Sequence, residues 1–154
     1  MKNFITKNKK ETEKLGKKIG EEILRKKPKN KAFVITLEGD LGGGKTTFVK
    51  GLAKGLGIKE KVLSPTFILV KKFEISKRAS NFSHFFHIDC YRIEKPKEIL
   101  GLGFKEITKK PTNIVAIEWA NKIERIIPKK SLQIKFEFLG KNKRKILIKW
   151  QKDC

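Results

Sequence analysis

The feature that most constrains the fold of this chain is a glycine-rich loop, Gly39–Thr46, whose sequence GDLGGGKT fits the pattern GxxxxGK followed by Ser or Thr. A short apolar run rich in β-branched and aromatic residues, Ala32–Glu38, precedes the loop and is typical of a strand buried on both faces. After the loop, apolar residues in Lys45–Leu56 recur with a helical period, and Gly57 stands where a helix C-terminus favours glycine. A strand, a glycine loop and a helix in this order predict a P-loop.

The residue types in this loop suit the binding of phosphate groups. Glycines allow several backbone N–H groups to converge on a phosphate without side chains blocking its approach. Lys45 brings a positive charge to the terminal phosphates, and the Thr46 hydroxyl can ligate Mg²⁺ at the N-terminus of the helix. We therefore predict that the loop binds a nucleoside triphosphate with Mg²⁺, through Gly39, Asp40, Leu41, Gly42, Gly43, Gly44, Lys45, Thr46 and Thr47.

Hydrolysis of a bound nucleotide needs more than a P-loop, because the metal requires an acidic partner and the attacking water must be oriented. Two acids follow buried strand candidates: Asp89 ends the run Phe85–Asp89, and Glu118 ends Ile114–Glu118. Open α/β sheets bind their ligands at such strand ends. Each acid has a simpler alternative role, which is to neutralise a nearby cation such as Arg92.

The remaining patterns predict an α/β fold that spans residues 1–154 as one domain: a mixed, mostly parallel sheet with flanking helices and a C-terminal antiparallel hairpin. Helical periodicity begins at Thr12 and ends at Leu24. Strands are expected at Phe67–Val70 and Phe85–Asp89, joined by a polar loop at 76–83, and at Asn113–Trp119. Helices are expected after Pro96 and from Trp119 to Ile127. The C-terminal hairpin comprises Leu132–Phe138 and Ile146–Trp150.

Composition narrows the class of protein less than the motifs do. The chain carries 38 Lys and Arg against 16 Asp and Glu, a net charge of +22 that favours contact with polyanions such as nucleic acid. The same lysines also fit a genome of biased base composition, with Lys spread over every solvated face. Apolar runs fall far short of the roughly 18 residues of a membrane span, and the two distant cysteines suggest no disulfide scaffold, so a cytoplasmic protein is expected.

Four motifs together resemble the TsaE family, in the order and approximate spacing of that family. They are Gly39–Phe48, Ser64–Phe67, His87–Arg92 and Ile117–Trp119, and the resemblance covers nearly the whole chain. TsaE proteins are the bacterial P-loop ATPases needed to make threonylcarbamoyladenosine in tRNA. The resemblance implies an ATPase that is required for the modification of adenosine 37 in tRNAs reading codons that begin with A, and that acts as a nucleotide-driven switch on the partner proteins TsaB and TsaD. It places the threonylcarbamoyl transfer itself on TsaD.

The resemblance also implies roles for individual residues. Lys45 and Thr46 would hold phosphates and Mg²⁺, Glu118 would be a second metal ligand, and Asp89 would help to place metal or water, so Lys45, Asp89 and Glu118 form the implied catalytic set. Within Ser64–Phe67, a switch loop, Thr66 would contact the nucleotide. Two further candidates keep alternative roles: Thr12 lies near the base or caps a helix, and Trp119 covers the nucleotide or packs in the core.

Three other functions are possible for a chain with these motifs: a GTPase, a small-molecule kinase and a nonenzymatic RNA-binding domain. In a GTPase, Asn121–Glu124 would read guanine, but Glu124 replaces the required Asp, and Cys-Tyr-Arg follows Asp89 instead of Asp-x-x-Gly. A small-molecule kinase needs arginines that clamp two phosphate groups, whereas those of this chain are dispersed. A nonenzymatic RNA-binding domain would explain the charge but not the retention of Lys45 together with both acids.

Overall fold

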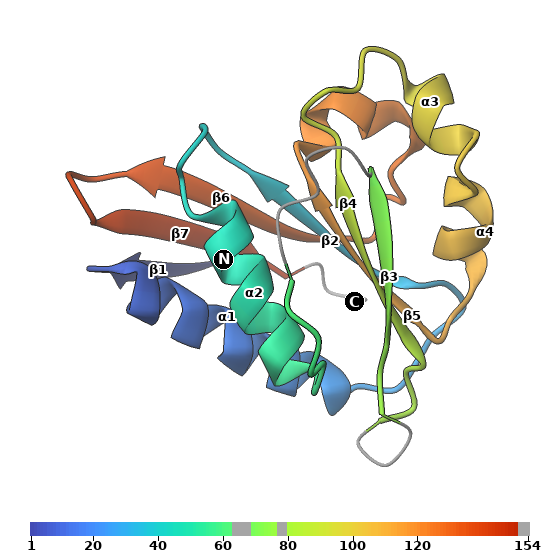
Figure 1. Cartoon of the computed structure of the whole chain (residues 1–154), viewed down its shortest axis with the longest axis horizontal. Helices are drawn as coiled ribbons and strands as arrows, with labels where there is room; N and C mark the ends of the chain where they lie inside the picture. The colour runs from blue at the N-terminus through green and yellow to red at the C-terminus, as the bar shows by residue number, and fades with distance from the viewer. Residues whose placement is uncertain (63–68, 77–79, 151–154) are drawn as a thin grey trace.

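The computed structural model describes residues 1–62, 69–76 and 80–150. Seven strands form one sheet in the order β1-β7-β6-β2-β5-β4-β3 (Figure 1). The strands are β1 (Lys2–Thr6), β2 (Phe33–Glu38), β3 (Val70–Glu74), β4 (His84–Asp89), β5 (Asn113–Glu118), β6 (Leu132–Phe138) and β7 (Arg144–Lys149). The helices are α1 (Lys9–Leu24), α2 (Lys45–Gly55), α3 (Pro96–Leu100), α4 (Phe104–Lys109) and the 3-10 helix η1 (Ala120–Ile126).

The sheet is mixed, with its parallel strands in the middle. β2 pairs in parallel with both β5 and β6, and β5 pairs in parallel with β4. The remaining pairings, β1 with β7, β7 with β6, and β3 with β4, are antiparallel. β1, β2, β4, β5 and β6 therefore point the same way, which confirms the predicted mostly parallel sheet and its C-terminal hairpin. The parallel arrangement also brings the carboxyl ends of β2, β5 and β4 to the same end of the sheet.

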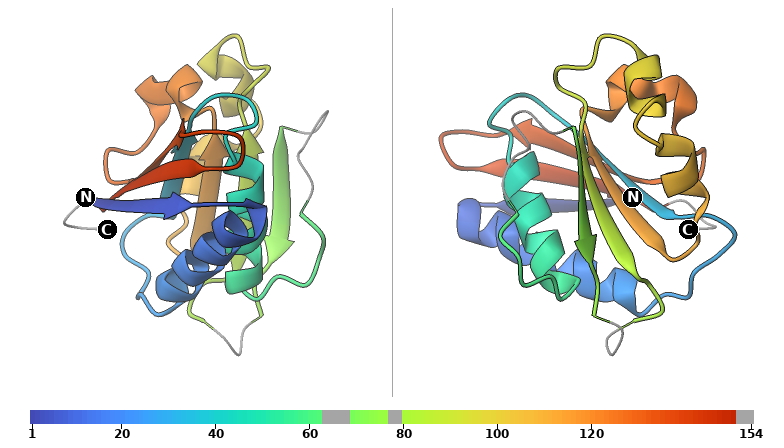
Figure 2. Two further views of the ribbon diagram at one scale, coloured as in Figure 1. Left: turned by 90° about the vertical axis from the view of Figure 1, so that its left-hand side faces the viewer. Right: turned by 45° about the vertical axis from the view of Figure 1, so that its right-hand side comes forward.

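Helices cover both faces of the sheet, so the molecule has three layers (Figures 1 and 2). α1 and α2 lie side by side on one face, where their apolar residues and those of the strands form one buried cluster. α3, α4 and η1 cover the other face over a second cluster. β5 is buried along its whole length, because both of its faces are covered by helices.

Strand and helix positions follow the predictions around the glycine loop. β2 and α2 flank the loop as expected, and Gly57 has a φ of +77° just after α2, the left-handed conformation that favours glycine. The predicted hairpin of Phe85–Asp89 with the preceding strand is present as β3 and β4.

Other elements differ from the predictions. β1 was not predicted; it pairs with β7 at the edge of the sheet. β3 begins only at Val70, whereas 67–70 was expected as a strand; residues 67 and 68 lie outside the described part of the chain. α1 begins at Lys9 instead of Thr12, and α4 is an additional helix after Gly103. The segment after Trp119 is helical but forms a kinked 3-10 helix. Apart from α1, these are short elements or edge strands, whose periodicity is weak.

Candidate functional site

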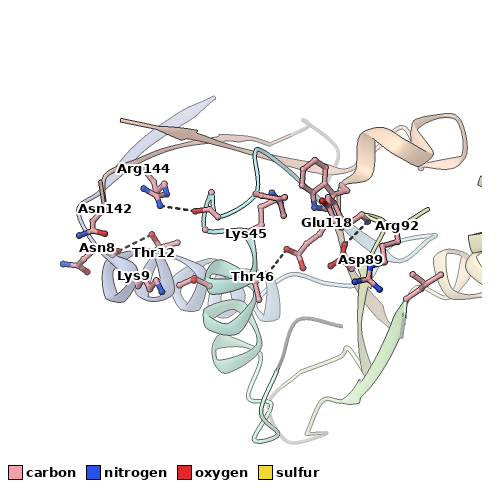
Figure 3. Close-up of a pocket in the computed structure, with 18 residues that line it drawn as sticks. Asn8, Lys9, Thr12, Lys45, Thr46, Asp89, Arg92, Glu118, Asn142 and Arg144 are labelled. Atoms are coloured by element: carbon pink, nitrogen blue, oxygen red, sulfur yellow. Dashed lines mark hydrogen bonds between the residues drawn. The ribbon is translucent and has the colours of Figure 1, made fainter. Parts of the chain in front are cut away.

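A cavity of about 390 Å³ opens at the carboxyl ends of the central strands. It is lined by the glycine loop and the start of α2, by the first turn of α1, by residues that end or follow β4 and β5, and by the turn between β6 and β7. Figure 3 shows its two ends. Glu118, Asp89 and Arg92 lie on one side of Lys45 and Thr46, and Asn8, Thr12, Asn142 and Arg144 lie on the other.

Most sequence-predicted residues meet in this cavity. Those that line it are Thr12, Leu41, Gly42, Gly43, Gly44, Lys45, Thr46, Thr47, Asp89, Glu118 and Trp119. Gly39 and Asp40 do not line it. Thr66, the remaining predicted nucleotide contact, lies outside the described residues, as does the whole of the predicted switch loop at 64–67.

The glycine loop adopts its shape through left-handed backbone conformations. Gly39, Gly42 and Gly44 have φ values of +149°, +73° and +100°, in the region that side chains disfavour. Gly44 is the N-cap of α2 and makes no side-chain cap, so the first turn of the helix keeps backbone N–H groups available at the cavity. This is the arrangement in which a helix N-terminus receives an anion.

Lys45 is the charged group at the centre of the cavity and is only 5% exposed. Its Nζ donates hydrogen bonds to the backbone carbonyls of Gly39 and Asp40, and lies 4.3 Å from the ring centroid of Trp119. Burial lowers the pKa of Lys45, while the negative charges of Glu118, Asp89 and Asp40 oppose that decrease. Gly39 and Asp40 thus contribute carbonyl groups that hold the lysine, not surface that lines the cavity.

Glu118 joins two elements at the metal-binding end of the predicted site. Its Oε1 accepts a hydrogen bond of 3.1 Å from the Thr46 hydroxyl at the start of α2. Its Oε2 lies 2.6 Å from Nε2 of His87, a side chain of β4 that is completely buried. Glu118 itself is 2% exposed. Both oxygens of a buried carboxylate are therefore engaged, as such a group requires.

Asp89 lies directly across from Glu118 in the register of β4 and β5. Its Oδ1 accepts a hydrogen bond of 3.0 Å from the backbone N–H of Tyr91. Burial raises the pKa of Asp89; the Tyr91 N–H opposes this, and the charge of Glu118 adds to it. The alternative role of neutralising a nearby cation stays a prediction for both acids: Glu118 bonds to Thr46 and His87, and its negative charge also acts on Lys45.

The chemistry of these donors fits Mg²⁺ without forming a complete cage for it. Among the described residues, no group of three or more His, Cys, Asp or Glu side chains is placed to hold a metal ion. Thr46 and Glu118 bring a hydroxyl and a carboxylate oxygen together at one point, and Asp89 lies beside Glu118. Mg²⁺ prefers oxygen ligands and is usually held by one or two carboxylates together with phosphate oxygens and water.

Thr12 is a buried side chain of the first turn of α1, not its cap. Asn8 is the N-cap, and its Oδ1 accepts a hydrogen bond of 2.9 Å from the N–H of Glu11. The Thr12 hydroxyl lies 2.8 Å from that of Thr6 in β1. The alternative of a capping role for Thr12 is therefore wrong, because the helix begins one turn earlier than its apolar periodicity indicates.

Trp119 combines features of its two predicted roles. It is half-buried, packs against the second core cluster and also lines the cavity beside Lys45. Its φ of +57° makes it the only non-glycine residue with positive φ in the described part of the chain. Its ring centroid lies 5.1 Å from that of Tyr91. The strained backbone turns the indole from the end of β5 toward the site.

Several residues that line the cavity were not predicted from the sequence. Arg144 at the start of β7 donates from Nη2 to the Gly42 carbonyl at 3.0 Å, and its guanidinium lies 4.0 Å from the ring centroid of Phe138. Asn8, Lys9, Leu69, Tyr91 and Asn142 also line the cavity. No local motif marks Arg144, because it lies 102 positions from Gly42 and reaches the loop only through the pairing of β6 with β2.

A glycine loop between a parallel central strand and the N-terminus of a helix, with acids on the neighbouring strand ends, defines a P-loop-like α/β protein. Comparison with known proteins narrows this class. Residues 6–146 match the family model described as threonylcarbamoyl adenosine biosynthesis protein TsaE. The chain belongs to the TsaE family.

Individual relatives agree with this assignment. A Bacillus subtilis (strain 168) tRNA threonylcarbamoyladenosine biosynthesis protein TsaE is 42% identical over 73% of this chain, and the match spans 66% of its own length. Its Rickettsia felis counterpart is 35% identical over 92% of this chain and 75% of its own. The crystal structure of Bacillus subtilis YdiB superposes with a TM-score of 0.75 at 33% identity, covering 96% of this chain and 83% of that one.

Among the described residues, no helix is both long and apolar enough to cross a membrane.

Proposed function

We propose that this protein binds ATP with Mg²⁺ and hydrolyses it in support of threonylcarbamoyladenosine formation in tRNA. The observation that carries the proposal is the hydrogen bond of 3.1 Å between Thr46 and Glu118, made beside the buried Lys45 at the N-terminus of α2. A hydroxyl, a carboxylate and a cation meet there where a helix N-terminus favours anions. The two halves of this constellation lie 72 positions apart in the sequence.

Each side chain has a defined task in the proposal. Lys45 exchanges the Gly39 and Asp40 carbonyls for phosphate oxygens, since its Nζ already lies at the base of the loop. Thr46 and Glu118 hold Mg²⁺, and Asp89 orients the metal shell or the attacking water. Bound Mg²⁺ would neutralise negative charge on the phosphate oxygens. The half-buried side chain of Asp89 faces the cavity beside Glu118.

Removal of the lysine charge tests nucleotide binding. We expect Lys45→Ala to weaken ATP binding at least about tenfold, because the charge that meets the terminal phosphates is lost. Isothermal titration of ATP with Mg²⁺ measures this effect, and Lys50→Ala is the matched control in the same helix but outside the cavity. Equal ATP affinity in the Lys45→Ala and Lys50→Ala proteins would contradict the proposal. Competition between ATP and GTP in the same assay tests the GTPase alternative.

The proposed partners follow from the biosynthetic function of the relatives and from the absence, among the described residues, of a site for a second phosphorylated substrate. In the described residues, the cavity arginines Arg92 and Arg144 lie at its opposite ends and form no clamp for a second phosphorylated substrate. We therefore infer that hydrolysis resets a partner, with TsaB and TsaD as the partners and their tRNA as the final substrate, in the cytoplasm. Association of the purified protein with a TsaB–TsaD pair that does not depend on ATP would contradict this part.

A further inference from the structure

His87 is a buried polar residue to which neither the motif nor the proposed hydrolysis assigns a role. Its side chain is 0% exposed in the middle of β4, on the sheet face that carries α1 and α2. Within the described residues its Nδ1 has no hydrogen-bond partner, and its Nε2 contacts Glu118 at 2.6 Å. An apolar residue would fill this position at a lower cost of desolvation. The presence of an imidazole here therefore calls for a functional explanation.

The sheet register places His87 where it can act on Glu118. His87 pairs with Ala116 of β5, and Glu118 is the next residue on the same face of that strand. The small side chain of Ala116 leaves room for the imidazole to reach diagonally along the sheet. An ionised carboxylate can only accept a hydrogen bond, so with Glu118 ionised it is Nε2 of His87 that donates in this contact. His87 thus presents one fixed donor to Oε2 of Glu118.

The effect of this donor is to restrict the Glu118 carboxylate. With Oε2 held by His87, the plane of the carboxylate is set, and Oε1 is directed at the Thr46 hydroxyl. Figure 3 shows Glu118 and Thr46 pointing toward each other across the cavity. Groups that hold metal-ligating carboxylates in orientation change metal affinity by about 10–100-fold when they are removed.

We propose that His87 is a positioning residue for Glu118, holding its carboxylate in the orientation that receives a divalent cation together with Thr46. This inference rests on the proposed function, because it concerns the cation that accompanies ATP. It assigns His87 no contact with nucleotide, metal or water. Its effect should therefore be confined to the part of the nucleotide affinity that depends on Mg²⁺.

The experiment compares binding of a non-hydrolysable ATP analogue in EDTA and in saturating Mg²⁺, by isothermal titration, for wild type and for variants at His87. Leucine fills a similar volume without a donor, whereas the glutamine amide can place an N–H near the position of Nε2. The Mg²⁺-dependent gain is the ratio of the analogue affinity in Mg²⁺ to that in EDTA. We expect His87→Leu to reduce this ratio by at least about tenfold. The affinity of the same variant in EDTA should stay within about twofold of wild type. His87→Gln should recover most of the gain.

Control variants separate positioning from packing. His84→Leu removes the other histidine of β4, which bonds to Ser83 and lies outside the cavity, and it should leave the Mg²⁺-dependent gain unchanged. If His87→Leu does not fold, His87→Asn replaces it. The shorter asparagine amide stops short of Glu118, so it should lose the gain that His87→Gln retains.

Four results are decisive. A wild-type Mg²⁺-dependent gain in the donor-free variant, or an equal loss in the Gln variant and the donor-free variant, would overturn the role of His87. A wild-type protein whose analogue binding ignores Mg²⁺ would instead overturn the proposed function. Loss of the gain in the donor-free variant with recovery in His87→Gln supports the inference, and in a Glu118→Gln background the same His87 substitution should then cause no further loss.

Discussion

At the residue scale, Arg144 shows how a single side chain from a distant element completes the glycine loop. Its guanidinium bonds to the Gly42 carbonyl and stacks on Phe138, so it holds the loop against the β6–β7 hairpin. The planar guanidinium makes both contacts at once, which an ammonium group does not.

Replacement of this arginine should loosen the loop. We expect Arg144→Ala to weaken ATP binding by about fivefold, which corresponds to one lost hydrogen bond of about 1 kcal/mol. Arg144→Lys should not restore the affinity. Titration of ATP measures the effect, and Arg125→Ala, an exposed residue of η1 outside the cavity, is the charge-matched control. Identical affinities for the two alanine variants would contradict this role.

Cys90 illustrates a residue beside the site that should be chemically inert. The thiol is completely buried, and burial raises its pKa to about 12, with the charge of Asp89 adding to the increase. At pH 8 only about one thiol in ten thousand would be ionised, and the thiolate is the reactive form.

We therefore expect Cys90 to resist iodoacetamide in the native protein at pH 8, and to remain slow at pH 9, because its ionisation lies well above both. Denaturation should expose the thiol and return its pKa toward the ordinary value, so that alkylation becomes rapid. Mass spectrometry of the peptide that contains Cys90 reports the modification. Native labelling at the rate of a free thiol would show that the burial is wrong.

At the scale of elements, the packing of α1 on α2 is governed by glycines that sequence periodicity does not single out. Added at Gly51, a Cβ would lie 1.9 Å from the Glu13 carbonyl oxygen; at Gly16 it would lie 2.2 Å from that of Phe48. These glycines let the two backbones touch, and this contact brings the first turn of α1, with Thr12, up to the glycine loop.

An alanine in this contact should separate the helices. We expect Gly51→Ala to destabilise the protein by about 1–3 kcal/mol, as overpacking does, lowering Tm by about 3–9 °C. At Gly101, φ is −64° and an added Cβ lies 3.6 Å from the nearest atom, an ordinary contact, so Gly101→Ala should leave Tm unchanged or raise it slightly. Thermal unfolding followed by circular dichroism compares the two; equal Tm values would refute the packing argument.

At the scale of the whole molecule, the net charge of +22 acts on stability as well as on binding. Like charges on a compact protein repel one another, and dissolved salt screens that repulsion. One ion pair among the described residues, Lys54 with Glu13 at the α1–α2 contact, offsets only a small part of this repulsion.

Salt should therefore raise the thermal stability. We expect Tm to increase as NaCl is raised from about 20 to about 300 mM, over which the Debye length falls severalfold. A variant with exposed lysines outside the nucleotide cavity replaced by glutamine, at Lys14, Lys59, Lys109 and Lys141, should show a smaller increase. A Tm that falls with salt, or an equal increase in the variant, would show that self-repulsion does not limit stability.

Local patterns predicted the glycine loop, its flanking strand and helix, the central strands and the C-terminal hairpin. These predictions are confirmed because each element depends on a run of consecutive residues, such as Ala32–Glu38 before the loop. The same reasoning missed β1 and α4 and placed the start of β3 before Val70, since the bounds of short elements are decided by what they pair or pack with. β1 exists because β7 offers it an edge.

What the sequence alone determined is the kind of site: a P-loop with Lys45 and Thr46, and acids that end two buried strands. Only the tertiary structure decided which groups complete it, because the contacts join residues far apart in the chain. His87 meets Glu118 across 31 positions, and Arg144 meets Gly42 across 102. The order of the strands and the packing of the helices bring these residues into contact. Strand order and helix packing depend in turn on the burial of both apolar faces of the sheet, which is a property of the whole chain.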